Sequence, residues 1–299
     1  MSRLIDPPLI DDRPSLTLGV EVGGSLVRIW VYPATEAPRG VVLAIHGFRG
    51  DHHGLRRLIN ALPEYLIIAP DLPGFGASEA WGTLPHTASG YGAVIEALRQ
   101  RFELGASTLL LGHSFGSIVA SHYLAKNPGT FGRLVLVNPI CERALEGGSA
   151  LSSAVAGGYY GAAAKLPVRY GEALLRAGVV VDATTAAMLT SQDPSTRRYV
   201  RDQHRAYFAG FSDPDTLLES YRSSIADTVL DVAAEISAPT LLIAGEKDPL
   251  GSVAGQERLR ATFPDAELTM IPRVGHLIHY ETPAVAAGSL RAWAQRHPA

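Results

Sequence analysis

Short apolar runs alternate with longer segments of helical period along most of this 299-residue chain, and this alternation restricts the fold more than any other feature. Most of the short runs are nearly continuous in apolar residues, as strands covered on both faces should be. A strand–helix–strand order predicts an α/β fold with a mostly parallel sheet between helices. We expect strands at 25–32, 41–45, 65–69, 108–111, 133–137, 240–244 and 267–271, an antiparallel hairpin edge at 16–22, and helices at 89–103, 117–126, 253–262 and 283–296.

The alternation breaks between Pro139 and about Ala238, where no convincing strand is found. Apolar residues have helical spacing in 171–189 and 197–211, and turn signals separate the segments. We therefore predict a helical cap inserted after the sixth strand, with a core of residues 1–138 and 239–299 and a cap of residues 139–238. The turn signals are Gly147-Gly148, Gly157-Gly158, Asp193-Pro194 and Asp213-Pro214.

Composition excludes several classes of protein. The chain is 46% hydrophobic and 18% charged, which is typical of a globular protein. A net charge of −3 without a basic run argues against nucleic acid as a partner. A single cysteine, Cys141, allows no internal disulfide and fits a reducing compartment. We expect it to be a small buried or half-buried residue at the root of the cap and not a nucleophile. Because the N-terminal segment lacks the apolar core of a secretory signal and no run approaches about 20 apolar residues, we expect a cytoplasmic protein with no membrane partner.

Residues 112–117, GHSFGS, place one serine between two glycines directly after an apolar run, TLLL. The pattern G-x-S-x-G is that of a nucleophile in a sharp turn between a strand and a helix. Bulky neighbours would clash in that turn, and Gly112 and Gly116 remove the clash. Ser114 is therefore the predicted nucleophile.

Acyl transfer by a serine needs a base, an acid that orients the base, and donors for the developing oxyanion. Asp248 follows the strand at 240–244, and His276 lies in the loop after the strand at 267–271. The carboxyl ends of the strands form one edge of such a sheet, so we expect these side chains to meet Ser114 there. Glu246 and Glu142 are the alternatives for the acid, and His279 is the alternative base.

Two backbone N–H groups are expected to form the oxyanion hole. Phe115 follows the nucleophile at the start of a helix, where amides lack intrahelical acceptors. Phe48 lies in the loop HGFRGDHHG after the strand at 41–45, and Gly47 lets the backbone turn there.

The chain resembles the α/β-hydrolase superfamily, in the subgroup with a helical cap. The resemblance is carried by HGF at 46–48, DLPGFGAS at 71–78, GHSFG at 112–116, GEKDP at 245–249 and GHLIHYETP at 275–283, and it weakens in the cap. It implies that Ser114 is the nucleophile, His276 the base, Asp248 the orienting acid, and the Phe48 and Phe115 amides the oxyanion donors. The serine at 114 argues against the relatives that use aspartate there. Ser117 stands where the family often has a second glycine.

Several residues near these motifs are candidates for contact with substrate: His46, Arg49, His113, Tyr159, Tyr207 and Leu277. Arg49 could put a cation near the pocket mouth and favour an acidic substrate group, or it could point outward and pair with Asp51. Cap aromatics could line an apolar pocket or only pack helices together. We expect no metal at His52-His53, because adjacent histidines should point in different directions and no set of ligands surrounds them.

The sequence therefore predicts a serine hydrolase that cleaves a small-molecule carboxylic ester through an acyl-enzyme, without a cofactor. The runner-up is a carbon–carbon bond hydrolase of ring-cleavage dienoates, although His113 and Leu277 stand where those enzymes often have asparagine and an aromatic residue. Thioesters and lactones stay open as substrates, and a ligand receptor on the same scaffold is the non-enzyme alternative. An apolar cap surface could serve a pocket or a homodimer.

Overall fold

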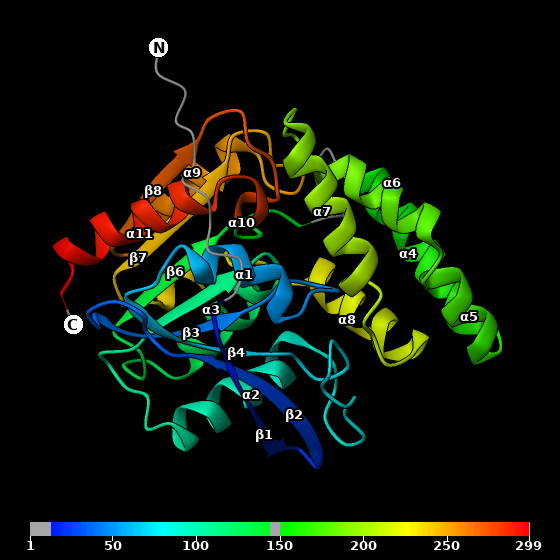
Figure 1. Ribbon diagram of the computed structural model, residues 1–299, viewed down its shortest axis with the longest axis horizontal. Helices are drawn as coiled ribbons and strands as arrows, with labels where there is room; N and C mark the ends of the chain where they lie inside the picture. The colour runs from blue at the N-terminus through cyan, green and yellow to red at the C-terminus, as the bar shows by residue number, and fades with distance from the viewer. Residues whose placement is uncertain (1–12, 144–149, 299) are drawn as a thin grey trace.

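The computed structural model describes residues 13–143 and 150–298. In these residues one sheet of eight strands runs through the protein in the order β1-β2-β4-β3-β5-β6-β7-β8 (Figure 1). β1 pairs antiparallel with β2, and β2 pairs antiparallel with β4, whereas all later neighbours are parallel. The strands are β1 Leu16–Val22, β2 Ser25–Tyr32, β3 Gly40–Ile45, β4 Tyr65–Pro70, β5 Leu109–His113, β6 Arg133–Val137, β7 Thr240–Gly245 and β8 Ala266–Ile271.

Each face of the sheet is covered by helices, as the strand composition predicts. Side chains alternate between the faces along a strand, so Leu43 and Ile45 of β3 join one core cluster while Val42 and Ala44 join the other. The first cluster includes residues of α2 (Ala88–Arg101) and α3 (Phe115–Lys126). The second includes residues of α1 (His52–Asn60) and α11 (Pro283–Arg296).

Helix α1 was not expected, because it begins inside the loop that was interpreted as carrying an oxyanion donor. Asp51 caps it by accepting a hydrogen bond from the His53 backbone N–H at 2.8 Å. A polar N-cap satisfies an amide that has no intrahelical acceptor, and this allows a helix as short as nine residues to start sharply. Helix α9 (Val253–Thr262) has the predicted bounds, and a short α10 (Ile278–Glu281) follows the loop of His276.

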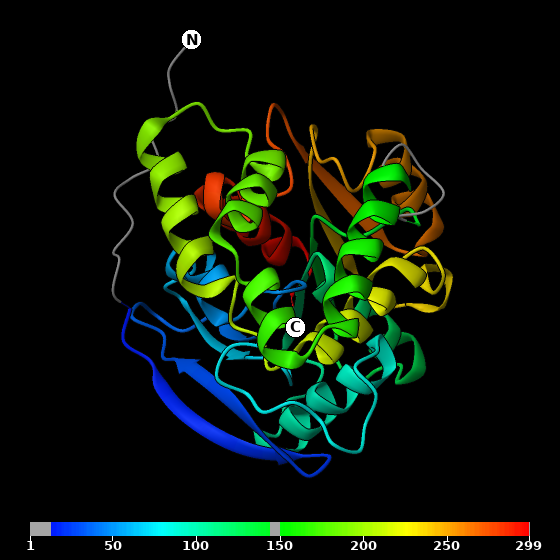
Figure 2. The ribbon, with the colours of Figure 1, turned by 90° about the vertical axis from the view of Figure 1, so that its right-hand side faces the viewer.

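Five α-helices lie between β6 and β7 in the described residues, gathered beside one end of the sheet (Figures 1 and 2). They are α4 Ala150–Lys165, α5 Val168–Leu175, α6 Gly178–Met188, α7 Pro194–Tyr207 and α8 Pro214–Ala226. The expected breaks at Asp193 and Asp213 are N-caps of α7 and α8. The 171–189 segment forms two helices, because the chain leaves helical geometry at Arg176 and Ala177.

The expected turn at Gly157-Gly158 is wrong, because both residues lie inside α4. Glycine disfavours a helix by only about 1 kcal/mol relative to alanine. The packing of α4 on α8 keeps the helix continuous through this pair. The other expected turn, at Gly147-Gly148, lies outside the described residues.

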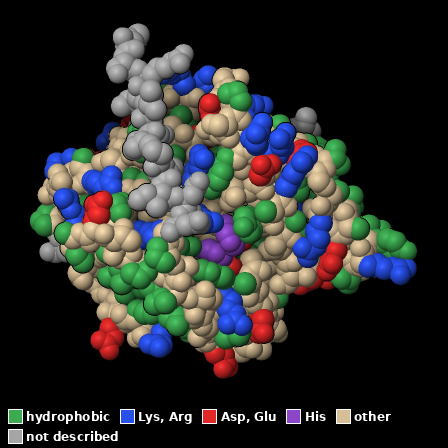
Figure 3. All heavy atoms as spheres, viewed as in Figure 1, with side chains coloured by type: hydrophobic (Ala, Val, Ile, Leu, Met, Phe, Trp, Pro, Cys, Tyr) green, Lys and Arg blue, Asp and Glu red, His purple; other side chains and the backbone are tan. Residues whose placement is uncertain are grey.

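Among the described residues, no helix combines the length and the apolar character needed to cross a bilayer. Side chains of both charge signs are mixed on the face shown in Figure 3, and hydrophobic side chains gather with them toward the end of the inserted helices. Exposed apolar residues there include Val168, Tyr170 and Leu174 of α5. Whether this surface meets a second copy of the chain stays a prediction.

Candidate active site

Ser114 lies in a strained turn between β5 and α3. Its φ of 52° and ψ of −121° are unusual for a residue with a side chain. The flanking glycines are required sterically: a Cβ on Gly112 would lie 2.4 Å from the Gly116 carbonyl oxygen, and one on Gly116 would lie 2.3 Å from that of Ile45. This is the clash that the G-x-S-x-G pattern was expected to avoid.

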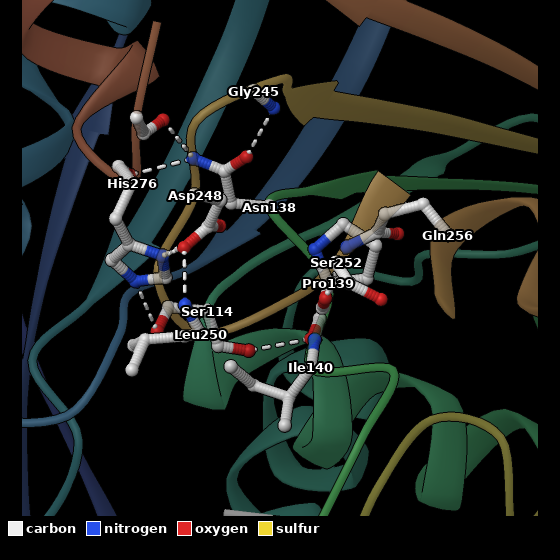
Figure 4. Close-up of polar contacts among 12 residues, drawn as sticks. Ser114, Asn138, Pro139, Ile140, Gly245, Asp248, Leu250, Ser252, Gln256 and His276 are labelled. Carbon is white, nitrogen blue, oxygen red and sulfur yellow. Dashed lines mark hydrogen bonds and ion pairs between the residues drawn. The ribbon is translucent and has the colours of Figure 1, made fainter. Parts of the chain in front are cut away.

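His276 connects the serine to a carboxylate (Figure 4). Its Nε2 lies 2.8 Å from Ser114 Oγ, and its Nδ1 lies 3.0 and 2.9 Å from the two carboxylate oxygens of Asp248. The backbone N–H of Leu250 donates to Asp248 Oδ1 at 2.8 Å and helps to fix the carboxylate. All three side chains of the triad are buried. With Nδ1–H directed at the carboxylate, Nε2 is free to accept the serine proton.

The alternative acids have other partners, and the alternative base lies in a separate short helix. Glu246 accepts a hydrogen bond from the backbone N–H of Arg273, and Glu142 accepts two from Ser252. His279 lies in α10, where its Nδ1 is buried without a partner in the described residues. The structure therefore brings together the three residues predicted for the triad and none of their alternatives.

Asn138 joins the two loops that carry His276 and Asp248, a role that sequence reasoning missed. Its side-chain NH₂ donates to the backbone carbonyls of His276 at 2.6 Å and Gly275 at 3.1 Å, and its side-chain oxygen accepts from the Gly245 N–H at 2.8 Å (Figure 4). The residue is fully buried at the end of β6 and has a φ of 45°. Asparagine tolerates this backbone conformation better than most residues. The sequence signal that could have indicated this role is the pair Asn138-Pro139, which directly follows a strand.

The two predicted oxyanion donors flank the nucleophile. Phe115 is the first residue of α3, and Phe48 follows Gly47, whose added Cβ would lie 3.1 Å from Ser114 Cβ. His46 holds this loop: its ring Nδ1 lies 2.8 Å from the Gly47 carbonyl, and its Nε2 accepts from the Leu72 N–H at 2.8 Å. Burial lowers the pKa of His46, so the ring stays neutral and keeps both contacts.

A cavity of about 300 Å³ opens over Ser114 and His276, between the sheet and the inserted helices. Phe48 and Phe115 lie in its wall. Five of the six residues predicted to contact substrate also line it: His46, Arg49, His113, Tyr207 and Leu277. The sixth, Tyr159, is absent from the lining, because its hydroxyl donates to the Leu174 carbonyl at 2.7 Å and ties α4 to α5.

Arg49 does not point outward and does not pair with Asp51, as one expectation had it. Only 2% of the residue is exposed. Its guanidinium donates to the backbone carbonyls of Leu175 at 3.0 Å and Phe208 at 3.2 Å, and it lies 4.6 Å from the Phe208 ring centroid. Leu175 is the last residue of α5 and Phe208 is the C-cap of α7, so both carbonyls lie at helix C-termini, where the helix dipole is negative. Arg49 therefore fastens the loop that contains Phe48 to the inserted helices.

A family model described as the alpha/beta hydrolase fold matches residues 40–283, which include all three residues of the triad. The chain belongs to the α/β-hydrolase family.

Relatives within and around this family support the same placement. The chain is 24% identical over 259 residues to Lipase 3 of Moraxella sp. (strain TA144), covering 84% of this chain and 76% of that protein. It is 28% identical over 273 residues to the monoacylglycerol lipase of Mycolicibacterium smegmatis, covering 87% and 89%. A solved esterase, EaEST from Exiguobacterium antarcticum, superposes with a TM-score of 0.74 at 15% identity, covering 93% of this chain and all of that one (100%). The last likeness shows the shared fold.

Ser117, where the α/β-hydrolase family often has glycine, supports the elbow. Its hydroxyl donates to the Ser114 carbonyl at 2.5 Å and accepts from the Ile140 N–H at 3.2 Å. The Ser114 N–H donates to the Val137 carbonyl at 3.0 Å. These bonds hold the strained turn against the end of β6.

The expectation that His52 and His53 point in different directions is wrong, because their ring centroids lie 3.8 Å apart. Together with Asp51 they offer one ligand atom each within 4.8 Å of one another. Both imidazoles already contact a carboxylate through Nδ1, at 2.9 Å for His52 with Asp71 and at 3.2 Å for His53 with Asp51. Asp71 also accepts from the backbone N–H groups of His52 and Ala77 at 2.8 and 2.9 Å, so this cluster fixes two turns of the core. The absence of a metal stays a prediction.

Proposed function

We propose that this protein is a serine hydrolase that cleaves carboxylic esters through an acyl-enzyme on Ser114. The observation that carries the proposal is the 2.8 Å contact between His276 Nε2 and Ser114 Oγ, with His276 Nδ1 on Asp248. A contact of this length lets the imidazole accept the hydroxyl proton as the serine attacks. The names of the lipase relatives agree with ester chemistry.

The proposed reaction has two halves. Ser114 Oγ attacks the ester carbonyl carbon while its proton passes to His276 Nε2, and the carbonyl oxygen gathers negative charge against the Phe48 and Phe115 amides. The carbon–oxygen bond to the alcohol then breaks, and His276 returns the proton to the leaving oxygen. Water repeats the attack through His276, which releases the acid and restores the serine.

The test is hydrolysis of p-nitrophenyl esters of increasing chain length by the wild-type protein and Ser114→Ala. We expect Ser114→Ala to lower kcat by at least about a thousandfold, as loss of a triad nucleophile does. Ser121→Ala is the matched control, because Ser121 is a buried serine of α3 that lies outside the site. Fluorophosphonate labelling should be lost in Ser114→Ala and kept in Ser121→Ala.

Appreciable esterase activity in Ser114→Ala would overturn the proposal. An acyl-CoA and a ring-cleavage dienoate, assayed in parallel, decide between ester, thioester and carbon–carbon bond cleavage. Labelling of Ser114 without turnover of any of these substrates would indicate a ligand receptor instead.

A further inference from the structure

The cavity over Ser114 has two walls of different chemistry. The first lies where α4 packs on α8, beside the loops after β6 and β7. The second lies where α7 packs on α6, α10 and α1. The first wall is mostly apolar, with Ile140, Ala156, Ile225 and Leu250 beside Tyr160 and Tyr221. The second contains a group that we call the histidine wall: His113, His204, His279 and Tyr280.

The histidine wall starts beside His276 and continues away from it as a series of neighbouring rings. The ring centroids of His276 and His113 are 5.4 Å apart, and those of His113 and His279 are 4.0 Å apart. Tyr280 follows at 4.3 Å from His279, and His204 at 5.4 Å from Tyr280. His276 must return its proton to the leaving oxygen, so the leaving alcohol has to lie beside this imidazole and next to the wall.

Polar atoms of the wall have no protein partner in the described residues. His113 Nε2 and His279 Nδ1 are buried and make no hydrogen bond. The Tyr280 hydroxyl and His204 Nε2 also receive none from the part of the chain that the structure describes, although His204 Nδ1 lies 2.8 Å from the Thr185 hydroxyl. Leaving a buried polar group unpaired costs about 1–3 kcal/mol. The atoms His113 Nε2 and His279 Nδ1 are out of reach of a ligand in the cavity, whereas His279 Nε2, His204 Nε2 and the Tyr280 hydroxyl are not fully buried and belong to residues that line it. A ligand that covers these three atoms must therefore hydrogen-bond to them.

The wall is polar but carries no positive charge near neutral pH. Burial lowers the pKa of His113 and His279 well below the usual 6.5, and it lowers the pKa of His204 to about 4. A neutral imidazole has one N–H donor and one acceptor nitrogen, and a phenol both donates and accepts. Hydroxyl groups have the same dual character. A carboxylate or phosphate would instead need a cation, and the Arg49 guanidinium is engaged with carbonyls of the inserted helices.

We propose that the histidine wall binds the leaving alcohol of the substrate and that this alcohol is a polyol. The inference rests on the proposed esterase function and names its substrate class. The acyl chain then lies along the apolar wall, and the polyol leaves with the proton from His276 after its bond to the acyl carbon breaks. Free hydroxyl groups of the polyol hydrogen-bond to His279 Nε2, His204 Nε2 and the Tyr280 hydroxyl.

The experiment compares two esters of one acid, 1-monooctanoylglycerol and propyl octanoate, which differ by two hydroxyl groups. We expect kcat/KM of the wild-type protein to be at least about tenfold higher for the glycerol ester, which corresponds to 1.4 kcal/mol. Tyr280→Phe removes one oxygen and should lower this ratio about fivefold, the effect of one hydrogen bond. His279→Leu should lower it at least as much. Tyr221→Phe, on the opposite wall, is the matched control and should keep the ratio.

Equal kcat/KM values for the two esters, or an unchanged ratio in both Tyr280→Phe and His279→Leu, would overturn the inference. Fluorophosphonate labelling of each variant shows that Ser114 and His276 are still assembled. If propyl and p-nitrophenyl esters are hydrolysed without preference for the glycerol ester, only the polyol inference fails. If no ester is hydrolysed, the proposed function itself fails.

Discussion

The side-chain amide of Asn138 donates a hydrogen bond to the backbone carbonyl of His276, with 2.6 Å between nitrogen and oxygen. The same side chain accepts a hydrogen bond from Gly245, at the end of the strand that leads to Asp248. The residue that directly follows β6 therefore joins the loop of the base to the loop of its acid. Asn138 is a positioning residue in this structure.

Asn138→Ala should lower kcat about 10- to 100-fold and change KM little, because a base displaced by about 1 Å can cost 10²-fold in rate. The rate of fluorophosphonate labelling should fall in parallel, since it depends on the same proton transfer. Asn127→Ala is the control: it also removes a hydrogen bond from asparagine to a backbone carbonyl, but at the end of α3. A loss that appears in stability alone, with kcat unchanged, would contradict the positioning role.

Arg49→Met should lower the free energy of unfolding by about 2–4 kcal/mol, because it leaves carbonyls at the ends of α5 and α7 without their charged donor. Urea unfolding measures this change, and faster hydrogen exchange in α5 and α7 would locate it. Arg197→Met, on an exposed position of α7, should change stability by less than about 0.5 kcal/mol. Equal effects of the two substitutions would show that Arg49 does not fasten the inserted helices.

Two glycine-to-alanine substitutions should have opposite effects. Gly116→Ala brings a Cβ to 2.3 Å from the Ile45 carbonyl oxygen and should abolish activity or folding. Gly158→Ala meets nothing within 4 Å and lies inside α4, so it should raise the free energy of unfolding by about 0.5–1 kcal/mol. Urea titrations of both proteins check the signs. A destabilised Gly158→Ala would mean that α4 is not continuous through this position.

Stability should fall between pH 6.5 and about 4, in part because of His204. Burial lowers the pKa of this histidine to about 4 in the folded protein, against 6.5 for an ordinary histidine. Between these values the unfolded chain binds a proton that the folded protein does not, so the free energy of unfolding decreases by up to about 1.4 kcal/mol per pH unit. Below about pH 4 both states are protonated and this contribution ends. Urea unfolding at pH 7, 6 and 5 should show a smaller decrease in His204→Phe, and an identical decrease would contradict the assignment.

The thiol of Cys141 should not react in the folded protein. It is fully buried, and burial raises its pKa to about 12, so the reactive thiolate is scarce at pH 8. Titration with an aromatic disulfide reagent should find no fast thiol in buffer and one per chain in denaturant. A fast reaction in buffer would show that the root of the inserted helices opens.

Local patterns predicted much of the fold. The bounds of β2, β6 and α9 were predicted to the residue, because short apolar runs and helical periods are bounded there by turn residues. Helix α1 was missed because its first turn, Asp-His-His-Gly, has no apolar period. The turn predicted at Gly157-Gly158 is absent, because a pair of glycines favours a turn locally whereas packing of α4 on α8 keeps the helix continuous.

Part of the candidate site could also be predicted from the sequence, and part could not. Ser114, Asp248 and His276 follow strands, so their meeting could be predicted from topology alone. The partners of Arg49 could not, since two of them are backbone carbonyls more than 100 residues away whose positions depend on how the inserted helices dock. The histidine wall also needs three segments to come together, from β5, α7 and α10.

The way Arg49 holds the inserted helices affects which sequence changes those helices can accept. The two shortest hydrogen bonds of Arg49 go to the backbone carbonyl oxygens of Leu175 and Phe208. Every amino acid has such an oxygen. Substitutions of side chains in α5 and α7 therefore leave the acceptors of these two hydrogen bonds in place. The side chains of α5 and α7 can thus vary while the contacts between Arg49 and these two carbonyls, which hold the Phe48 loop, stay the same.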